Sequence, residues 1–142
     1  MRTFVIQPGA PLVHASETCA GGERRVTLSQ ERMLLSGDAP PDATWSIPLC
    51  ERTLGTAADE RCGILSAKTA TLARGPCDGA PFLLNAAGRG YFVSDHSAEE
   101  RLAILKSVAR LTPEEEIALH GDEWLLVRYL RRDVGEDRKS VV

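Results

Sequence analysis

Polar and apolar positions alternate along the first two-thirds of the chain, a pattern typical of half-buried β-strands. The alternation is loose over residues 13–18 and regular over residues 25–34, and Gly21 and Gly22 between them can take the positive φ angles of a hairpin turn. Further strands are predicted over residues 45–50, 62–72 and 91–93, with a short apolar run over residues 81–84. This part of the chain is therefore predicted to be β-structure.

Proline and glycine punctuate this β-region. Residues 36–42 (SGDAPPD) predict a dense loop, and residues 85–90 (NAAGRG) predict a turn. Pro48 has no backbone N–H to donate to a ladder, so the strand over residues 45–50 is expected at a sheet edge or a bulge. The odd-numbered positions of that strand are expected to point inward.

The pattern changes to helical spacing after His96. Ser97 and Glu100 have the spacing of a capping box, in which each side chain binds the backbone N–H of the other residue. Thr112 and Glu115 repeat this spacing. Two helix starts are therefore predicted.

Each predicted helix carries an apolar stripe, and Gly135 is expected to end the second helix. The first stripe contains Leu102, Ile104, Leu105, Val108 and Ala109, and the second contains Ile117, Trp124, Leu125, Val127 and Leu130. Strands followed by helices argue against a βαβ fold. The fold is predicted to be mainly β: a small β-sandwich over residues 1–95, followed by an α-helical hairpin over residues 96–142.

Composition narrows the functional classes. The chain has 142 residues, of which 43% are hydrophobic and 26% charged, which is typical of a globular protein. The formal net charge of −3 argues against a broad basic face for nucleic acid. No apolar run reaches the roughly 18 residues of a membrane-spanning helix, and residues 1–9 do not have the pattern of a signal peptide. We therefore expect no nucleic-acid partner and no membrane contact.

The histidines exclude one familiar zinc motif. A His-Glu-x-x-His site needs two histidines four residues apart, and His14, His96 and His120 are far from each other in the sequence. His120 is expected on a helix face and His96 beside a helix start. The acidic run over residues 114–116 is expected to favour the helix dipole rather than to bind a metal.

Four cysteines leave several possibilities open. Zinc sites usually contain closely spaced pairs, and no such pair occurs among Cys19, Cys50, Cys62 and Cys77. Cys50 and Cys62 can face each other across a hairpin and form a disulfide, which would indicate an oxidising compartment. Free, half-buried thiols and a Cys/His metal site assembled in space are the alternatives.

Nucleophilic and phosphate-binding motifs are also missing from the sequence. No Gly-x-Ser-x-Gly elbow occurs. The glycines of residues 85–90 lead into a strand, whereas a phosphate loop leads into a helix N-terminus. The residues themselves therefore assign no catalytic, cofactor-binding or metal-binding position.

Several segments, in the same order, resemble the aminopeptidase N (membrane alanyl aminopeptidase) family of zinc metallopeptidases. These are residues 4–13 (FVIQPGAPLV), 25–32 (RVTLSQER), 45–49 (WSIPL), 84–93 (LNAAGRGYFV) and 111–115 (LTPEE). The resemblance covers nearly the whole chain. It departs from the family at Asp95-His96, and Asp122 falls where the family often has an aspartate.

This resemblance implies a parent enzyme that removes N-terminal residues from peptides with one zinc ion. In that family the zinc ligands and catalytic residues lie in a preceding domain, and neither its Gly-Ala-Met-Glu-Asn motif nor its His-Glu-x-x-His motif occurs here. The chain would be the β-sandwich third domain with the first helices of a truncated helical C-terminal domain. It would contact the catalytic and helical domains, and it would hold the helical domain over the catalytic cleft. Peptide substrates would be bound by the full-length enzyme alone.

Two further expectations complete this interpretation. As part of a longer protein that extends beyond both ends, the chain would expose a surface at Trp124, Leu125 and Tyr129 and would tend to self-associate there. The alternative hypothesis is a standalone β-sandwich adaptor that binds a protein partner through an edge strand.

Overall fold

The computed structural model describes residues 2–33, 43–55 and 59–130. In chain order its elements are α1 (Arg2–Ile6), β1 (Ala10–Ala20), β2 (Glu23–Met33), β3 (Ile47–Thr53), β4 (Arg61–Leu65), β5 (Thr69–Pro76), β6 (Phe82–Leu83), the short 3-10 helix η1 (Ala86–Gly88), β7 (Val93–His96), α2 (Ala98–Lys106), the 3-10 helix η2 (Val108–Arg110) and α3 (Pro113–Leu130). The predicted loop over residues 36–42 and the predicted helix end at Gly135 lie outside the described residues.

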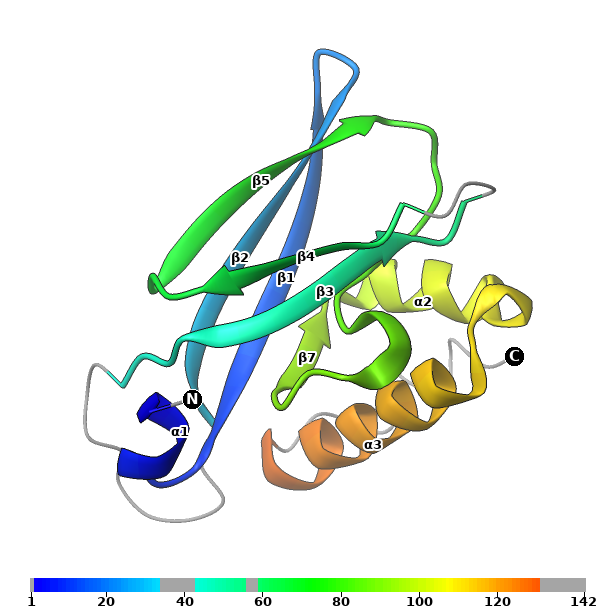
Figure 1. The fold of residues 1–142 in the computed structure, drawn as a ribbon. Helices are drawn as coiled ribbons and strands as arrows, with labels where there is room; N and C mark the ends of the chain where they lie inside the picture. Colours follow the sequence, from blue (N-terminus) through cyan, green and yellow to red (C-terminus); the bar gives the residue numbers. More distant parts are fainter. Residues whose placement is uncertain (1, 34–42, 56–58, 131–142) are drawn as a thin grey trace.

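The strands form two sheets, and the helices follow them. One sheet has the strand order β5-β2-β1-β7, and the other has the order β4-β3-β6. Figure 1 shows β3 and β4 crossing the face of the larger sheet, with α2 and α3 gathered near β7 and the lower part of β1. The predicted fold class, a small β-sandwich followed by a helical hairpin, is confirmed. The division into domains at residue 96 stays a prediction.

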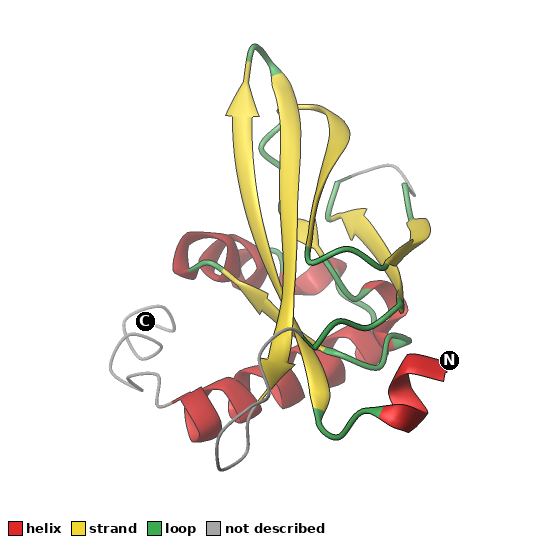
Figure 2. Ribbon diagram, turned by 90° about the vertical axis from the view of Figure 1, so that its left-hand side faces the viewer, coloured by secondary structure: helices red, strands yellow, loops and turns green. Residues whose placement is uncertain are grey.

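The long hairpin of β1 and β2 forms the centre of the larger sheet. Its strands pair from Ala10↔Met33 to Ala20↔Glu23, and the turn glycines Gly21 and Gly22 have φ angles of 60° and 78°. Because a residue without a Cβ takes these angles at little cost, the glycine pair permits the predicted two-residue turn. The tip of this hairpin extends well away from α3 (Figure 2).

A mainly aliphatic core fills the space between the sheets. Buried residues of both sheets contribute to it: Val13, Ala15, Val26, Leu28, Trp45, Ile47, Leu49, Leu65, Phe82, Leu84 and Phe92. Ile47, Leu49, Glu51 and Thr53 are the buried positions of β3, which confirms the predicted inward-facing odd positions. Pro48 is exposed, and its pairing partner is Ile64 on β4. At this point β3 is paired on one side, as the missing N–H of proline requires.

One prediction about the strands is wrong. The single strand expected over residues 62–72 is divided between the sheets, because β4 pairs with β3 and β5 pairs with β2. The buried Gln30 fixes the corner between them: its backbone N–H binds the carbonyl of Lys68 at 3.0 Å and its side-chain amide binds the carbonyl of Ala67 at 2.9 Å. The last strand, β7, runs parallel to β1, a long-range pairing that alternation along one strand cannot reveal.

Candidate functional site

The interface between the sandwich and α3 contains two buried carboxylates that accept hydrogen bonds from the sandwich. The side of α3 that faces the sheets contains Glu115, Leu119, Asp122 and Leu126, all less than a tenth exposed. The predicted apolar side is wrong at two positions, because Ile117 is 74% exposed and Trp124 is 59% exposed, whereas Leu125 is partly buried as expected. The helix turns two carboxylates inward because each finds hydrogen-bond donors on the sandwich.

Glu115 joins the first turn of α3 to the smaller sheet. Its two carboxylate oxygens accept hydrogen bonds at 2.8 and 2.7 Å from Nε and Nη2 of Arg52 on β3. The backbone N–H groups of Ala87 and Thr112 donate to the same carboxylate at 2.9 Å each. The Thr112–Glu115 capping box is thereby confirmed, since the Glu115 N–H donates to the Thr112 hydroxyl in return. Burial would raise the pKa of Glu115, but these hydrogen bonds outweigh burial and lower its pKa to about 2.

The backbone of η1 comes unusually close to α3 at this point. A Cβ placed on Gly88 would lie 2.8 Å from the Glu114 carbonyl oxygen, and Gly88 has a φ angle of +60°. The preceding Ala87 has a φ angle of 56°, which is strained for a residue with a side chain. That conformation aims the Ala87 N–H at Glu115. The segment over residues 85–90, predicted to be a turn, therefore packs against the N-terminal residues of α3.

Asp122 forms a second contact, two helical turns further along. Its Oδ2 accepts hydrogen bonds from the backbone N–H of Ser94 at 2.9 Å and from the Ser94 hydroxyl at 2.6 Å. Burial raises the pKa of Asp122 to about 6, although the two Ser94 hydrogen bonds lower it in part. This contact ties the middle of α3 to β7, a strand of the larger sheet.

Apolar contacts fill the spaces beside both carboxylates. Leu119 belongs to a buried cluster with Leu54, Leu83 and Ile104, between β6, α2 and α3. Leu126 packs with Leu12, Met33 and Val93 on the outer face of the larger sheet. The helix is therefore held by apolar burial, while the directional hydrogen bonds of Glu115 and Asp122 fix its register and its angle.

The shorter helix, α2, is attached to the larger sheet. Ser97 and Glu100 form the predicted capping box. The second oxygen of the Glu100 carboxylate accepts a hydrogen bond at 2.6 Å from the backbone N–H of Glu17 on β1. An ion pair between Arg101 and Glu123, at 3.4 Å, links α2 to α3.

The histidines lie apart and have different environments. On the outer face of the larger sheet, His14 places Nδ1 2.7 Å from an Asp95 oxygen and Nε2 3.0 Å from a Glu31 oxygen. The hydrogen bond to Asp95 is the largest cause of a raised pKa at His14. Because both ring nitrogens are engaged with carboxylates, His14 is not placed to accept a proton from a nucleophile.

The other two histidines fit their predicted positions. His96 ends β7 beside the start of α2, and burial lowers its pKa to about 4. Its Nε2 accepts a hydrogen bond of 3.4 Å from the backbone N–H of Leu84, as a neutral core histidine does. His120 lies on the exposed side of α3.

All four cysteines form disulfides, so of the alternatives that the sequence left open the structure shows the disulfide and not free thiols. The Cys50–Cys62 pair was among the sequence possibilities, and it forms because the two residues are direct partners in the β3–β4 ladder. Cys19 and Cys77 form the second disulfide, with Cα atoms 6.1 Å apart. The Cys77 N–H also binds the carbonyl of Gly22, so this disulfide fastens the end of β5 to the tip of the β1–β2 hairpin.

No protein-family model matches this chain, and no curated protein matches its sequence. Among the described helices, none combines the length and the apolar character needed to cross a membrane.

Proposed function

We propose that residues 1–142 are a non-catalytic scaffold portion of a zinc-dependent aminopeptidase that removes N-terminal residues from peptides. In this proposal the β-sandwich positions a helical domain, which begins with α2 and α3, over a catalytic cleft built by another part of the protein. The zinc and its ligands belong to that other part, and no residue of this chain takes a catalytic role.

One observation carries the proposal: the Arg52–Glu115 anchor fixes the first turn of α3 on the smaller sheet. A bidentate pair with a buried carboxylate has a strict geometric requirement, so it specifies the direction in which the helix leaves the sandwich. A spacer that holds one domain at a set angle to another needs such a joint. Two residues of this joint lie in segments that resemble aminopeptidase N: Glu115 in the LTPEE segment, and Ala87, whose N–H also donates to Glu115, in the LNAAGRGYFV segment. Arg52 lies outside those segments.

The activity of the isolated chain tests the non-catalytic part of the proposal. With both disulfides intact, the purified chain is expected to release no product from fluorogenic aminoacyl substrates, with or without added Zn²⁺. Zinc-dependent hydrolysis, lost on chelation and regained with Zn²⁺, would contradict it.

A second candidate function is the edge-strand adaptor, and one observation favours it. In the described part of the chain β4 pairs with β3 alone, and Ile64 on β4 is 70% exposed. A partner strand added to this edge would bind mainly through backbone hydrogen bonds. We expect Ile64→Lys to weaken such binding and Ile117→Lys, an equally exposed position on α3, to leave it unchanged. The adaptor function is excluded if the two variants bind the partner equally well.

A further inference from the structure

The Cys50–Cys62 disulfide lies on the surface, close to the end of the β3–β4 ladder where β4 begins. Its two cysteines are opposite each other in the register, with Cα atoms 4.0 Å apart. Cys62 is exposed and Cys50 is half-buried. Exposed disulfides are the ones that thiols in solution reach and reduce most readily.

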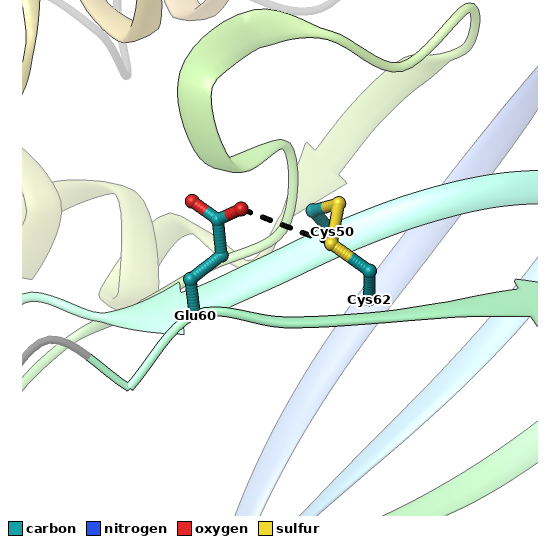
Figure 3. Close-up of side chains that lie close together, drawn as sticks. All are labelled: Cys50, Glu60 and Cys62. Carbon is teal, nitrogen blue, oxygen red and sulfur yellow. Dashed lines mark hydrogen bonds between the residues drawn. A yellow bond between two sulfur atoms is a disulfide. The ribbon is translucent and has the colours of Figure 1, made fainter.

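Glu60 brings a carboxylate to the same place. Its Oε1 is 3.8 Å from the Sγ of Cys62, a contact marked by the dashed line in Figure 3. The ligand atoms of Cys50, Glu60 and Cys62 all lie within 4.8 Å of one another. A disulfide sulfur has no proton to donate, so this contact becomes chemically useful when the disulfide is open.

We propose that reduction of the Cys50–Cys62 disulfide creates a Zn²⁺ site, in which the two thiolates and the Glu60 carboxylate are the protein ligands. A water molecule completes the tetrahedron from the solvent side, where Glu60 and Cys62 are exposed. This site is separate from the zinc of the proposed parent enzyme and does not depend on that proposal.

The geometry suits a tetrahedral zinc ion. Bonds of about 2.3 Å to sulfur and about 2.0 Å to oxygen place two sulfur ligands about 3.8 Å apart and a sulfur and an oxygen ligand about 3.5 Å apart. The observed separation between the Glu60 oxygen and the Cys62 sulfur, 3.8 Å, is close to that spacing. Directly opposed strand residues have Cβ atoms about 4.5–5.5 Å apart, so two reduced cysteines reach the sulfur spacing without moving the strands.

The chemistry balances with a dithiol as the reductant. The disulfide takes up two electrons and two protons and becomes two cysteine thiols, while the dithiol is oxidised to its own disulfide. When Zn²⁺ binds, each thiol loses its proton to solvent and each thiolate forms one bond to the metal. The S–S bond that breaks is thus replaced by two Zn–S bonds.

Arg89 is the natural competitor of the metal. Its guanidinium pairs with Oε1 of Glu60, the same oxygen that lies beside Cys62. In the oxidised protein this pair keeps the carboxylate in place near the sulfur. In the reduced protein Zn²⁺ must compete with Arg89 for that oxygen, so removal of the guanidinium is expected to tighten metal binding.

Cobalt titration tests the proposal, because tetrahedral Co²⁺ thiolates have an intense charge-transfer absorption. The chain is reduced with dithiothreitol, which is then removed under anaerobic conditions, and Co²⁺ is added. We expect one Co²⁺ per reduced chain, displaced by Zn²⁺, and no charge-transfer band from the oxidised chain. Fluorescence of the buried Trp45 checks that the reduced chain stays folded.

Matched variants locate the site. Cys19→Ser/Cys77→Ser removes the other disulfide and should keep the band, whereas Cys50→Ser/Cys62→Ser should lose it. Glu60→Gln should weaken Co²⁺ binding by about tenfold or more, and Arg89→Ala should strengthen it. The proposal is overturned if the Cys50→Ser/Cys62→Ser variant keeps the band. A reduced chain that gives no band, or that has lost its fold in the presence of Co²⁺, overturns it as well.

Discussion

The two buried carboxylates of α3 do the same structural task in opposite electrostatic settings. Glu115 meets a guanidinium and two backbone N–H groups, and its pKa falls to about 2. Asp122 meets the N–H and hydroxyl of one serine, and burial raises its pKa to about 6. The two neutral donors of Ser94 do not offset the cost of burying the Asp122 charge. The bidentate arginine and two N–H groups at Glu115 do offset it. The start of α3 is therefore the more firmly attached part of the helix at neutral pH, and its middle is the less firmly attached part.

The largest expected effect comes from removing the cation at the firm end. Arg52→Ala leaves Glu115 buried without its partner, which should lower the free energy of unfolding by about 3–5 kcal/mol. Urea denaturation measures the change. Arg128→Ala is the control, because Arg128 stacks on the exposed Trp124 and its loss should cost less than about 1 kcal/mol. If Arg52→Ala costs no more than Arg128→Ala, the anchor does not hold the helix.

A smaller effect is expected at Asp122, in the middle of α3. Asp122→Ala leaves the N–H and hydroxyl of Ser94 without their acceptor, at a cost of about 1–3 kcal/mol in the same experiment. Asp122→Asn keeps an acceptor oxygen and removes the buried charge, so at neutral pH it should destabilise less than Asp122→Ala does. Equal losses in the two variants would show that the charge matters more than the hydrogen bonds.

The free energy of unfolding is expected to change with pH in opposite directions for the two carboxylates. Glu115 has a folded pKa of about 2, below its ordinary value of 4.5, so the stability that it contributes is present above pH 4.5 and is lost as the pH falls toward 2. Asp122 has a folded pKa of about 6, above its ordinary value of 3.8, so its contribution declines as the pH rises from 3.8 to 6. Urea titrations across this range measure both slopes.

Single variants assign the slopes to their residues. Glu115→Gln should reduce the loss of stability below pH 4.5. Asp122→Asn should reduce the loss of stability between pH 3.8 and 6. A wild-type decline that persists unchanged in Asp122→Asn would mean that another group causes it.

The smallest expected effect concerns the outer side of α3. Trp124 is exposed and forms an edge-to-face contact with Tyr129, which offers an apolar surface for weak self-association. We expect sedimentation to show concentration-dependent association in the wild type and less of it in Trp124→Ser. Arg128→Ala keeps both aromatic rings and serves as the control. A wild type that stays monomeric at high concentration would contradict this prediction.

The sequence was sufficient for features encoded within a few residues. The glycine pair at 21 and 22 predicted the hairpin, and the spacings from Ser97 and Thr112 predicted both helix starts. Hydrophobicity could not identify the inner side of α3, because Glu115 and Asp122 look like solvent-facing residues until their donors on Arg52 and Ser94 are known. Each of those donors is far away in the sequence.

The disulfides illustrate the same limit. The Cys50–Cys62 pair was accessible to sequence reasoning because a short hairpin can place its two strands side by side. The Cys19–Cys77 pair depends on β5 joining the larger sheet, and the division of residues 62–72 between two sheets was not visible in their pattern. The contact between Glu60 and Cys62 could not be predicted either, because a carboxylate two residues before a cysteine is not a distinctive sequence pattern.

The most direct test of the central proposal is the native protein in its source cells, measured with an antibody raised against this chain. The account predicts a species several times larger than 15.4 kDa that, once purified, releases N-terminal residues from peptides and loses that activity on zinc chelation. A native species of 15.4 kDa without aminopeptidase activity would contradict the account.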